Sequence, residues 1–382
     1  MLALREARAR PEDIAGISYS SQANTFVLLD ERDQPLTPLI LWTDARAPQS
    51  PHLASFSNSP EFASTTGFSG IGALWAVNKL GWLQTHEPEI WRRTRHIKSL
   101  SDYFTFSLTG HHVGDSSTAS LLGLYDLRRG AWWDEALAAT GIGSAHLSRP
   151  LPPGTAVGVT LKASCGLLGL PQTIPFCVGG LDHQVAALGS GIGWKADASI
   201  STGTVLAALC VVTEPTPQND CYHGPWFRPG EYFRLAFDPN GAGQLEDLRT
   251  ALGTQVSIGD MIDAALPEYS DSINRTMLPT AATDRIRAVL ESIAQAHLRL
   301  LQRIDSGHSI RRLVATGGGA RSHSWLRAES AILQIPIMMT RCSERACLGA
   351  ALMAAYGAAH FGSLDQAVAA MVACDDACQP RH

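Results

Sequence analysis

One carboxylate in this sequence stands where a general base could act on a substrate hydroxyl. Asp182 follows an apolar segment and a Gly179-Gly180 turn, and it begins the helix predicted for residues 182–189. Asp is a favoured residue at the N-cap of a helix, and on spacing alone this structural role is the better explanation. A carboxylate that projects into a cleft can instead accept a proton from a substrate. The residues by themselves leave both roles open.

Two glycine-containing segments could hold a nucleotide. The apolar run Leu313-Val314-Ala315 leads into Gly317, Gly318 and Gly319, and a helix is predicted from Ser322. Glycines lack Cβ, so their backbone can approach a ligand, and the first N–H groups of a helix attract phosphate. Ser201-Thr202-Gly203-Thr204 is predicted as a tight hairpin whose N–H groups and hydroxyls could hold an anion. For each segment the alternative is an ordinary turn.

A third group combines an aromatic ring with an amide and a carboxylate. Gln22 follows one predicted strand, and Trp42, Asp44 and Arg46 follow another. Sugars and polyols are usually held by apolar stacking together with paired hydrogen bonds, which these side chains could supply. The alternative is a solvated loop that contains an Asp–Arg pair.

Composition narrows the class of protein. The 382 residues are enough for two domains, and 45% hydrophobic with 17% charged residues is typical of a globular chain. The net charge is −5 with no basic block, so nucleic acid is not an expected partner. No apolar run has the length of a membrane-spanning helix. The eight cysteines form no C-x-x-C pair, which predicts a reducing cytoplasm, no zinc and no metal-ligating residues.

The elements alternate between strands and helices. Glycines at 189–193 separate two halves that each contain a strand, a glycine-rich turn and a helix, which predicts two similar α/β domains with a cleft between them. Strands are predicted at residues 13–19, 25–29, 39–42, 175–179, 198–201, 205–212 and 336–339. Helices are predicted at residues 72–84, 87–95, 100–108, 182–189, 284–304, 322–332 and 348–360.

Taken in order, these motifs resemble the FGGY family of carbohydrate kinases, and its xylulokinases in particular. The segments that carry the resemblance are Ile-Ser-x-x-Ser-Gln22, Leu-Trp42-x-Asp44-x-Arg46, Ser101-Asp-Tyr103, Asp115-Ser-Ser-Thr-Ala-Ser120, Gly-Gly-x-Asp182, Ser201-Thr-Gly-Thr204, Arg287-Ala-Val-Leu-Glu291, Thr-Gly317-Gly-Gly-Ala-Arg-Ser322 and Leu348-Gly-Ala-Ala351. The order covers most of the chain and is more specific than any single motif.

The resemblance implies an α/β, two-domain actin/hexokinase-like (ribonuclease H-like) fold. Residues 1–192 would form the N-terminal, sugar-binding domain and residues 193–382 the C-terminal, nucleotide-binding domain. Asp182 would then be the catalytic base, with Gln22, Trp42 and Asp44 near the sugar. Ser201, Thr202, Gly203 and Thr204 would cradle the phosphates of ATP, and Gly317, Gly318 and Gly319 would line the adenosine pocket. Mg²⁺ would bridge phosphate oxygens, and a pentulose such as xylulose is the expected substrate.

The sequence departs from the family pattern in three places. The family begins with a strand that carries an Asp-x-Gly-Thr phosphate loop, and nothing like it precedes Arg10, so we expect an N-terminal domain that is incomplete at its start. A Pro-Tyr-x-x-Gly-Glu-Arg segment is replaced by residues 270–282, and Ala23-Asn24 stands where pentulose kinases often carry Met-His. The bare strand edge expected at the start would favour a homodimer.

Two interpretations stay open. The first is an ATP-dependent sugar or polyol kinase. The second is a degenerate kinase-fold protein that binds sugar or nucleotide without catalysis, and the unmatched first phosphate loop predicts weak or absent turnover for the chain as it stands. An oxidoreductase is much less consistent, because no Gly-x-Gly-x-x-Gly opens a βαβ unit.

Overall fold

The fold is given by a computed structural model, which describes residues 2–171, 174–203, 205–216, 221–241, 243–271, 278–305 and 307–380. Its contacts divide the chain into two units, each assembled from three segments. Unit 1 contains Met1–Gly189, Val212–Phe233 and Glu344–Met371, and unit 2 contains Ser190–Val211, Arg234–Ser343 and Val372–His382. The two contiguous domains predicted from the sequence, 1–192 and 193–382, stay a prediction.

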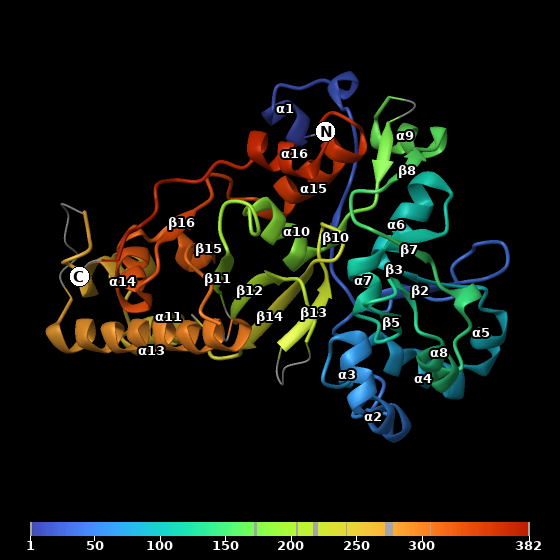
Figure 1. The fold of residues 1–382 in the computed structure, drawn as a ribbon, viewed down its shortest axis with the longest axis horizontal. Coiled ribbons are helices and arrows are strands. Elements are labelled where there is room, and N and C mark those ends of the chain that lie inside the picture. Colours follow the sequence, from blue (N-terminus) through green and yellow to red (C-terminus); the bar gives the residue numbers. More distant parts are fainter. Residues whose placement is uncertain are drawn as a thin grey trace. The chain divides into compact units, whose positions relative to one another are not determined.

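Unit 1 combines short strand pairs with many helices (Figure 1). Its strands are β1 (Ser20–Ser21), β2 (Phe26–Leu29), β3 (His96–Ser99), β4 (Val113–Asp115), β5 (Tyr125–Asp126), β6 (Ala131–Trp132), β7 (Arg149–Leu151), β8 (Ala156–Val159), β9 (Pro175–Cys177), β10 (Gly180–Leu181) and β13 (Cys221–Pro225). Its helices are α1 (Leu2–Glu6), α2 (Pro51–Ser57), α3 (Pro60–Thr66), α4 (Ala76–His86), α5 (Pro88–Arg93), α6 (Leu100–Thr109), α7 (Ser116–Ser120), α8 (Asp134–Thr140), α9 (Lys162–Leu168), α10 (Asp182–Gly189), α15 (Arg345–Gly357) and α16 (Leu364–Met371), with 3₁₀ turns at Pro11–Asp13 and Ser144–His146.

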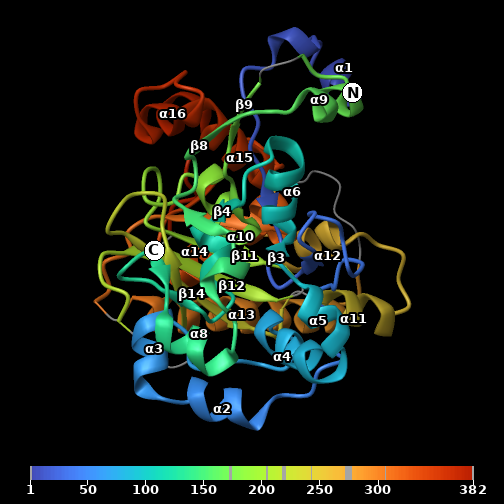
Figure 2. The same cartoon turned by 90° about the vertical axis from the view of Figure 1, so that its right-hand side faces the viewer.

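The helices of unit 1 start at local sequence signals and bury one face. Helices α2 and α3 each begin with a Ser-Pro pair, and the hydroxyls of Ser50 and Ser59 accept hydrogen bonds from the N–H groups of Leu53 and Phe62. Leu53 and Phe62 then enter an apolar core that also receives side chains from β2, α4 and α8. Helices α4 and α5 lie side by side at this end of the unit (Figure 2).

Two glycines let helices α10 and α15 of unit 1 pack at very short range (Figure 1). A Cβ on Gly349 would lie 1.9 Å from the carbonyl oxygen of Val185, and one on Gly189 would lie 2.0 Å from that of Arg345. Any side chain at either position would separate the helices. The helix at 345–357 confirms the small-residue helix predicted at 348–360, which was expected to pack closely.

Unit 2 is built on a twisted sheet with helices beside it. Its strands are β11 (Ala198–Thr202), β12 (Leu206–Val212), β14 (Tyr232–Asp238), β15 (Leu313–Gly317) and β16 (Ile337–Met339), and β14 begins in unit 1. Neighbouring strands follow the order β14-β12-β11-β15-β16, with β11 antiparallel to β12 and parallel to β15. Its helices are α11 (Gly243–Ala251), α12 (Ile258–Ala265), α13 (Thr280–Ile304) and α14 (His323–Leu333), with a 3₁₀ turn at Gly318–Arg321.

Helix α13 is the longest element and confirms the amphipathic helix predicted at 284–304 (Figure 1). Ile286, Ile293 and Leu300 are buried along one face, as predicted, because residues seven apart return to the same side of a helix. Leu290 is buried rather than the predicted Val289. Among the described residues no helix combines the length and apolar character needed to cross a membrane.

Two of the predicted strands are wrong. Residues 13–19 form only an isolated parallel bridge between Ile17 and Phe176, and residues 39–42 form only an antiparallel bridge between Phe26 and Ile40. In the second case, a side chain forms hydrogen bonds with the backbone carbonyls that would otherwise pair in a longer strand. The carbonyls of Leu41 and Trp42 accept hydrogen bonds from Lys79 Nζ, at 2.6 and 3.1 Å. Apolar periodicity does not report such competition from a distant lysine.

Candidate active site

The predicted base lies at the end of a parallel strand pair in unit 1. Ser20 pairs with Gly180 and Ser21 with Leu181, so β1 and β10 end at the same edge. The next residues along these strands are Gln22 and Asp182. Asp182 is half-buried, and its Oδ1 accepts a hydrogen bond from the N–H of His183 at 2.7 Å.

A buried carboxylate braces the strand that leads to Asp182. The hydroxyls of Ser117 and Tyr19 donate hydrogen bonds to Asp115, at 2.5 and 3.0 Å. Ser117 Oγ in turn accepts from the N–H of Leu181, the residue before Asp182, at 2.9 Å. Asp115 thus acts through Ser117 on the backbone that carries the candidate base. The motif 115–120 was noted in the sequence, but its contact with residue 181 depends on the fold.

Gln22 and Trp42 are joined through one hydroxyl. Thr25 Oγ1 accepts from Gln22 Nε2 at 3.0 Å and from the N–H of Trp42 at 2.9 Å. The backbone around Trp42 is also held by Lys79 Nζ, whose pKa is lowered by burial. Trp42 itself is 49% exposed. A ring that is exposed on a fixed backbone is suited to stack on the apolar face of a sugar.

Asp44 forms an ion pair with Arg46, two residues along the chain. Arg46 donates to both oxygens of Asp44, with Nε at 2.9 Å from Oδ1 and NH2 at 2.7 Å from Oδ2. These hydrogen bonds hold the pKa of Asp44 below its usual value. The alternative given for Asp44, an Asp–Arg pair in a loop, is therefore present. Gln22 and Trp42, in contrast, lie close together through Thr25.

The two candidate nucleotide segments meet in unit 2. In the parallel pairing of β11 with β15, Ser201 lies opposite Thr316 and Thr202 opposite Gly317. The predicted hairpin and the glycine run are therefore neighbours at one end of the sheet. Thr204, which was also predicted to contact phosphate, lies outside the described residues.

The three consecutive glycines have different structural roles. Gly317 has a φ of 78°, and a Cβ there would lie 2.7 Å from the carbonyl oxygen of Thr202. A Cβ on Gly319 would lie 2.6 Å from the Cβ of Thr202, whereas one on Gly318 would meet nothing closer than 3.9 Å. Two of the glycines are therefore needed for packing against β11. Gly318 is the one with open space, and it lines the adjacent cavity.

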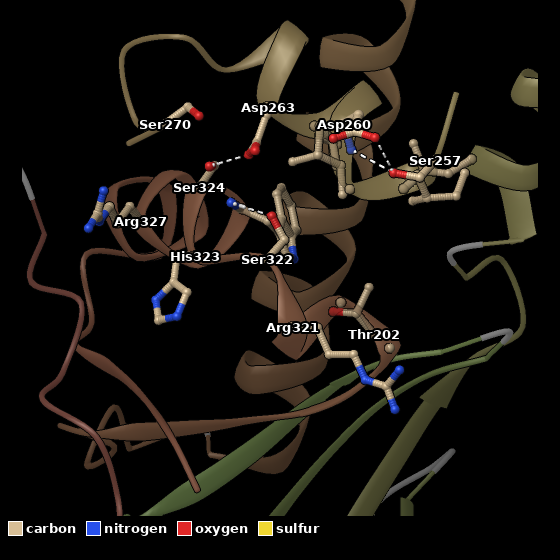
Figure 3. A pocket seen from close by; sticks show the side chains of 18 of the residues that line it. Thr202, Ser257, Asp260, Asp263, Ser270, Arg321, Ser322, His323, Ser324 and Arg327 are labelled. Carbon is tan, nitrogen blue, oxygen red and sulfur yellow. Dashed lines mark hydrogen bonds between the residues drawn. The ribbon is translucent and has the colours of Figure 1, made fainter. Parts of the chain in front are cut away.

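That cavity has a volume of about 980 Å³ and lies within unit 2 (Figure 3). Thr202, Gly203 and residues of the 3₁₀ turn line it, together with several apolar side chains. Those apolar side chains are Leu245, Ile258, Ile262, Leu290 and Trp325. An apolar slot beside a glycine-rich turn can hold a nucleobase and leave the phosphates at the turn.

Polar residues that the sequence analysis did not single out line the same cavity. Ser324 Oγ donates to Asp263 Oδ1, and Ser257 Oγ donates to Asp260 Oδ2 at 2.7 Å (Figure 3). Ser257-x-x-Asp260 is a capping pattern at the start of α12, so this pair had a local signal. The contact of α12 with α14 through Asp263 and Ser324 had none, because it joins residues 61 apart in the chain.

A buried pair holds the strand that carries the hairpin. His297 on α13 and Glu329 on α14 are fully buried, and Nδ1 of the histidine lies 2.6 Å from Oε1 of the glutamate. Nε2 lies 3.2 Å from the carbonyl oxygen of Ser201. Both ring nitrogens face acceptors, which favours the imidazolium form. Burial lowers the pKa of His297, but Glu329 and the Ser201 carbonyl outweigh it and raise the pKa above 6.5.

Comparison with known proteins agrees with the predicted resemblance. Residues 2–189 match the N-terminal domain of the FGGY family of carbohydrate kinases, and residues 264–358 match its C-terminal domain. The gluconokinase of Bacillus licheniformis is 25% identical in an alignment 389 residues long that spans 91% of this chain and 75% of that protein. The xylulose kinase of Streptomyces rubiginosus is 28% identical in an alignment 373 residues long that spans 92% of this chain and 76% of that protein.

Solved structures give the same result for the fold. The crystal structure of a xyloylose kinase from Brucella ovis has a TM-score of 0.83 at 23% identity and covers all of this chain and 83% of that one. A glycerol kinase with ADP from Plasmodium falciparum has a TM-score of 0.82 at 19% identity, covering 95% and 79%. The predicted actin/hexokinase-like α/β fold is confirmed. With both of its domains matched, the chain belongs to the FGGY family of carbohydrate kinases, which are phosphotransferases.

Proposed function

We propose that this kinase transfers the γ-phosphoryl group of ATP to a hydroxyl of a neutral sugar, with a pentulose such as xylulose as the first candidate. The observation that carries the proposal is the paired ending of β1 and β10, which puts Gln22 and Asp182 at one edge of unit 1. Asp182 would accept the hydroxyl proton while the oxygen attacks the γ-phosphorus. The bond to the β–γ bridging oxygen then breaks and ADP leaves.

Unit 2 has residues that fit a nucleotide. The apolar slot around Trp325 would take the adenine, and the N–H groups of Thr202, Gly203 and Gly318 would face the phosphates. Bound with ATP, Mg²⁺ would neutralise charge that develops on the transferred phosphoryl group. No residue of this chain is assigned to the metal.

The contacts around Trp42 favour a neutral sugar over a sugar acid. A carboxylate-bearing substrate such as gluconate needs a cation that is not already paired. Among the described residues around Trp42, Lys79 Nζ donates to the carbonyls of Asn24, Leu41 and Trp42, and Arg46 forms its ion pair with Asp44. Both cations are engaged, so a neutral polyol that stacks on Trp42 and bonds to Gln22 fits better.

The test measures ADP release by the purified chain with Mg²⁺–ATP and a panel of pentuloses, polyols and gluconate. We expect release to depend on sugar and kcat/KM to be highest for a neutral pentulose. A higher kcat/KM for gluconate would refute the assignment of substrate.

The second interpretation, a kinase-fold protein that binds without catalysis, has a distinct result in the same experiment. Calorimetry would then detect binding of sugar or of Mg²⁺–ATP, while no sugar in the panel stimulates ADP release. Binding together with sugar-dependent ADP release would exclude it.

A further inference from the structure

Three side chains from distant parts of unit 1 converge outside the candidate active site. Asp33 lies in the loop after β2, His96 is the first residue of β3, and His112 directly precedes β4. Asp33 Oδ1 is 3.7 Å from His96 Nε2 and 3.6 Å from His112 Nε2. Both distances are too long for hydrogen bonds. They are close to the spacing of roughly 3.4 Å between two ligands that each lie about 2.0–2.1 Å from a tetrahedral metal ion.

Two polar atoms of this cluster have no hydrogen-bond partner among the described residues. They are Asp33 Oδ1 and His112 Nδ1, and both are buried. A carboxylate oxygen that is removed from water and left without a partner is costly. A cation bound between the oxygen and the two imidazoles would satisfy the oxygen.

The cluster is held in place by the backbone around it. Leu29 pairs with His96 across β2 and β3, and a bridge from Leu29 to Pro35 closes the loop that contains Asp33. Asp33 itself has a φ of 59°, a conformation that is uncommon for residues other than glycine. The ring centroids of His96 and His112 lie 4.1 Å apart, so the two rings are in contact. Preorganised ligands reduce the ordering that metal binding would otherwise require.

Nearby positive charges limit the expected affinity. Lys98 has its Nζ 2.9 Å from Ser148 Oγ, and its charge contributes to a lowered pKa at both histidines. Arg95 acts on His96 in the same direction. Burial is the larger cause, and it lowers the pKa of His96 to about 4. A lowered pKa favours the neutral imidazole, which is the form that binds metal.

We propose that Asp33, His96 and His112 bind one divalent transition-metal ion, with Zn²⁺ as the best match, and leave a fourth position for water. Two imidazoles and one carboxylate are typical ligands for such ions, whereas Mg²⁺ prefers oxygen alone. The ion would join the loop after β2 to β3 and to the segment before β4. This site is independent of the nucleotide and of its Mg²⁺.

The experiment is equilibrium dialysis of the chelator-treated protein against Zn²⁺, followed by metal analysis. We expect one ion per chain, and affinity reduced by at least about 10- to 100-fold in His112→Ala and in Asp33→Asn. His86→Ala is the matched control, because His86 is exposed and its Nδ1 lies 3.1 Å from the carbonyl oxygen of Trp82 in its own helix. The increase of the unfolding midpoint on addition of Zn²⁺ should be largest in the unchanged protein and in His86→Ala and smaller in the two ligand variants, because an ion that binds the native state stabilises it.

Three results would overturn the proposal. The first is the absence of stoichiometric Zn²⁺ in the unchanged protein. The second is equal affinity in Asp33→Asn and His86→Ala, and this comparison is available even if His112→Ala fails to fold. The third is sulfur coordination in the X-ray absorption spectrum, which would assign the ion to cysteines. Nitrogen and oxygen coordination that is lost in Asp33→Asn would support it.

Discussion

Alanine substitutions in the glycine run separate packing from ligand contact. In Gly319→Ala the new Cβ would lie 2.6 Å from Thr202 Cβ, so β11 or the 3₁₀ turn must move. Overpacking of this kind costs about 1–3 kcal/mol. For a domain of about 150–250 residues this lowers the melting temperature by about 2–4 °C per kcal/mol. Because Thr202 carries the proposed phosphate contacts, ATP binding should weaken as well.

Gly318→Ala is the control from the same turn. Its Cβ would approach no described atom closer than 3.9 Å, and the position has no positive φ. Its stability should remain within about 0.5 kcal/mol of the unchanged protein. Since Gly318 lines the cavity, the added methyl group should still weaken ATP binding.

Differential scanning fluorimetry and calorimetric titration with Mg²⁺–ATP measure the two properties separately. Gly319→Ala should lose stability and affinity, and Gly318→Ala should lose affinity alone. Equal melting temperatures for the two variants would refute the packing role of Gly319. Unchanged ATP affinity in Gly318→Ala would refute the placement of nucleotide beside this turn.

Three further predictions concern the residues that support the site. Asp115→Asn should reduce kcat by about tenfold or more with little change in the KM for sugar, because it disturbs the hydrogen bonds that hold the backbone at Leu181 through Ser117. Steady-state kinetics measure both constants, and an unchanged kcat would mean that Asp115 has a purely structural role. Glu329→Gln should lower the free energy of unfolding, measured in urea, by about 3–5 kcal/mol, because His297 stays buried without its counter-ion. Replacing both residues by Leu should restore most of that stability, and equal losses in the single and the double variant would contradict the prediction. Since the folded pKa of His297 is raised above 6.5, its stabilisation is complete below about pH 6.5 and fades as pH rises through the folded value, a loss that the double variant should not show. Trp42→Ala should weaken the binding of neutral sugar, measured by calorimetry, by about tenfold. The free energy of unfolding should change by less than about 0.5 kcal/mol, since Trp42 is half exposed. A large loss of stability would mean that the ring contributes to packing instead.

The sequence predicted the elements whose signals are local. The helix that begins at Asp182, the hairpin strands at 198–202 and 206–212, and the strand, glycine turn and helix around Gly317 each follow from patterns within about a dozen residues. The candidate residue Asp182 was selected from the same kind of local pattern, whereas the strands predicted before Gln22 and Trp42 are the two that were wrong. Gln22, Trp42 and Asp182 all stand just past the end of an apolar segment.

Contacts between distant segments could not be predicted. Lys79 takes the carbonyls that a strand at 39–42 would have used, and nothing near residue 40 signals that lysine. His297 and Glu329 are 32 residues apart and belong to different helices, so no spacing reports their ion pair. The cluster of Asp33 with two histidines arises in the same way, from three segments that only the fold brings together.

Phosphoryl transfer from ATP to a sugar, detected by ³¹P NMR with the unchanged chain and with Asp182→Asn, tests the central claim most directly. The proposed mechanism predicts sugar phosphate from a neutral pentulose with the unchanged chain, at a rate well above that of Asp182→Asn, whatever the absolute rate. The variant should bind the same sugar with unaltered affinity, because only the proton acceptor is removed. Equal rates of sugar phosphate formation in the two proteins, or none in either, would contradict it.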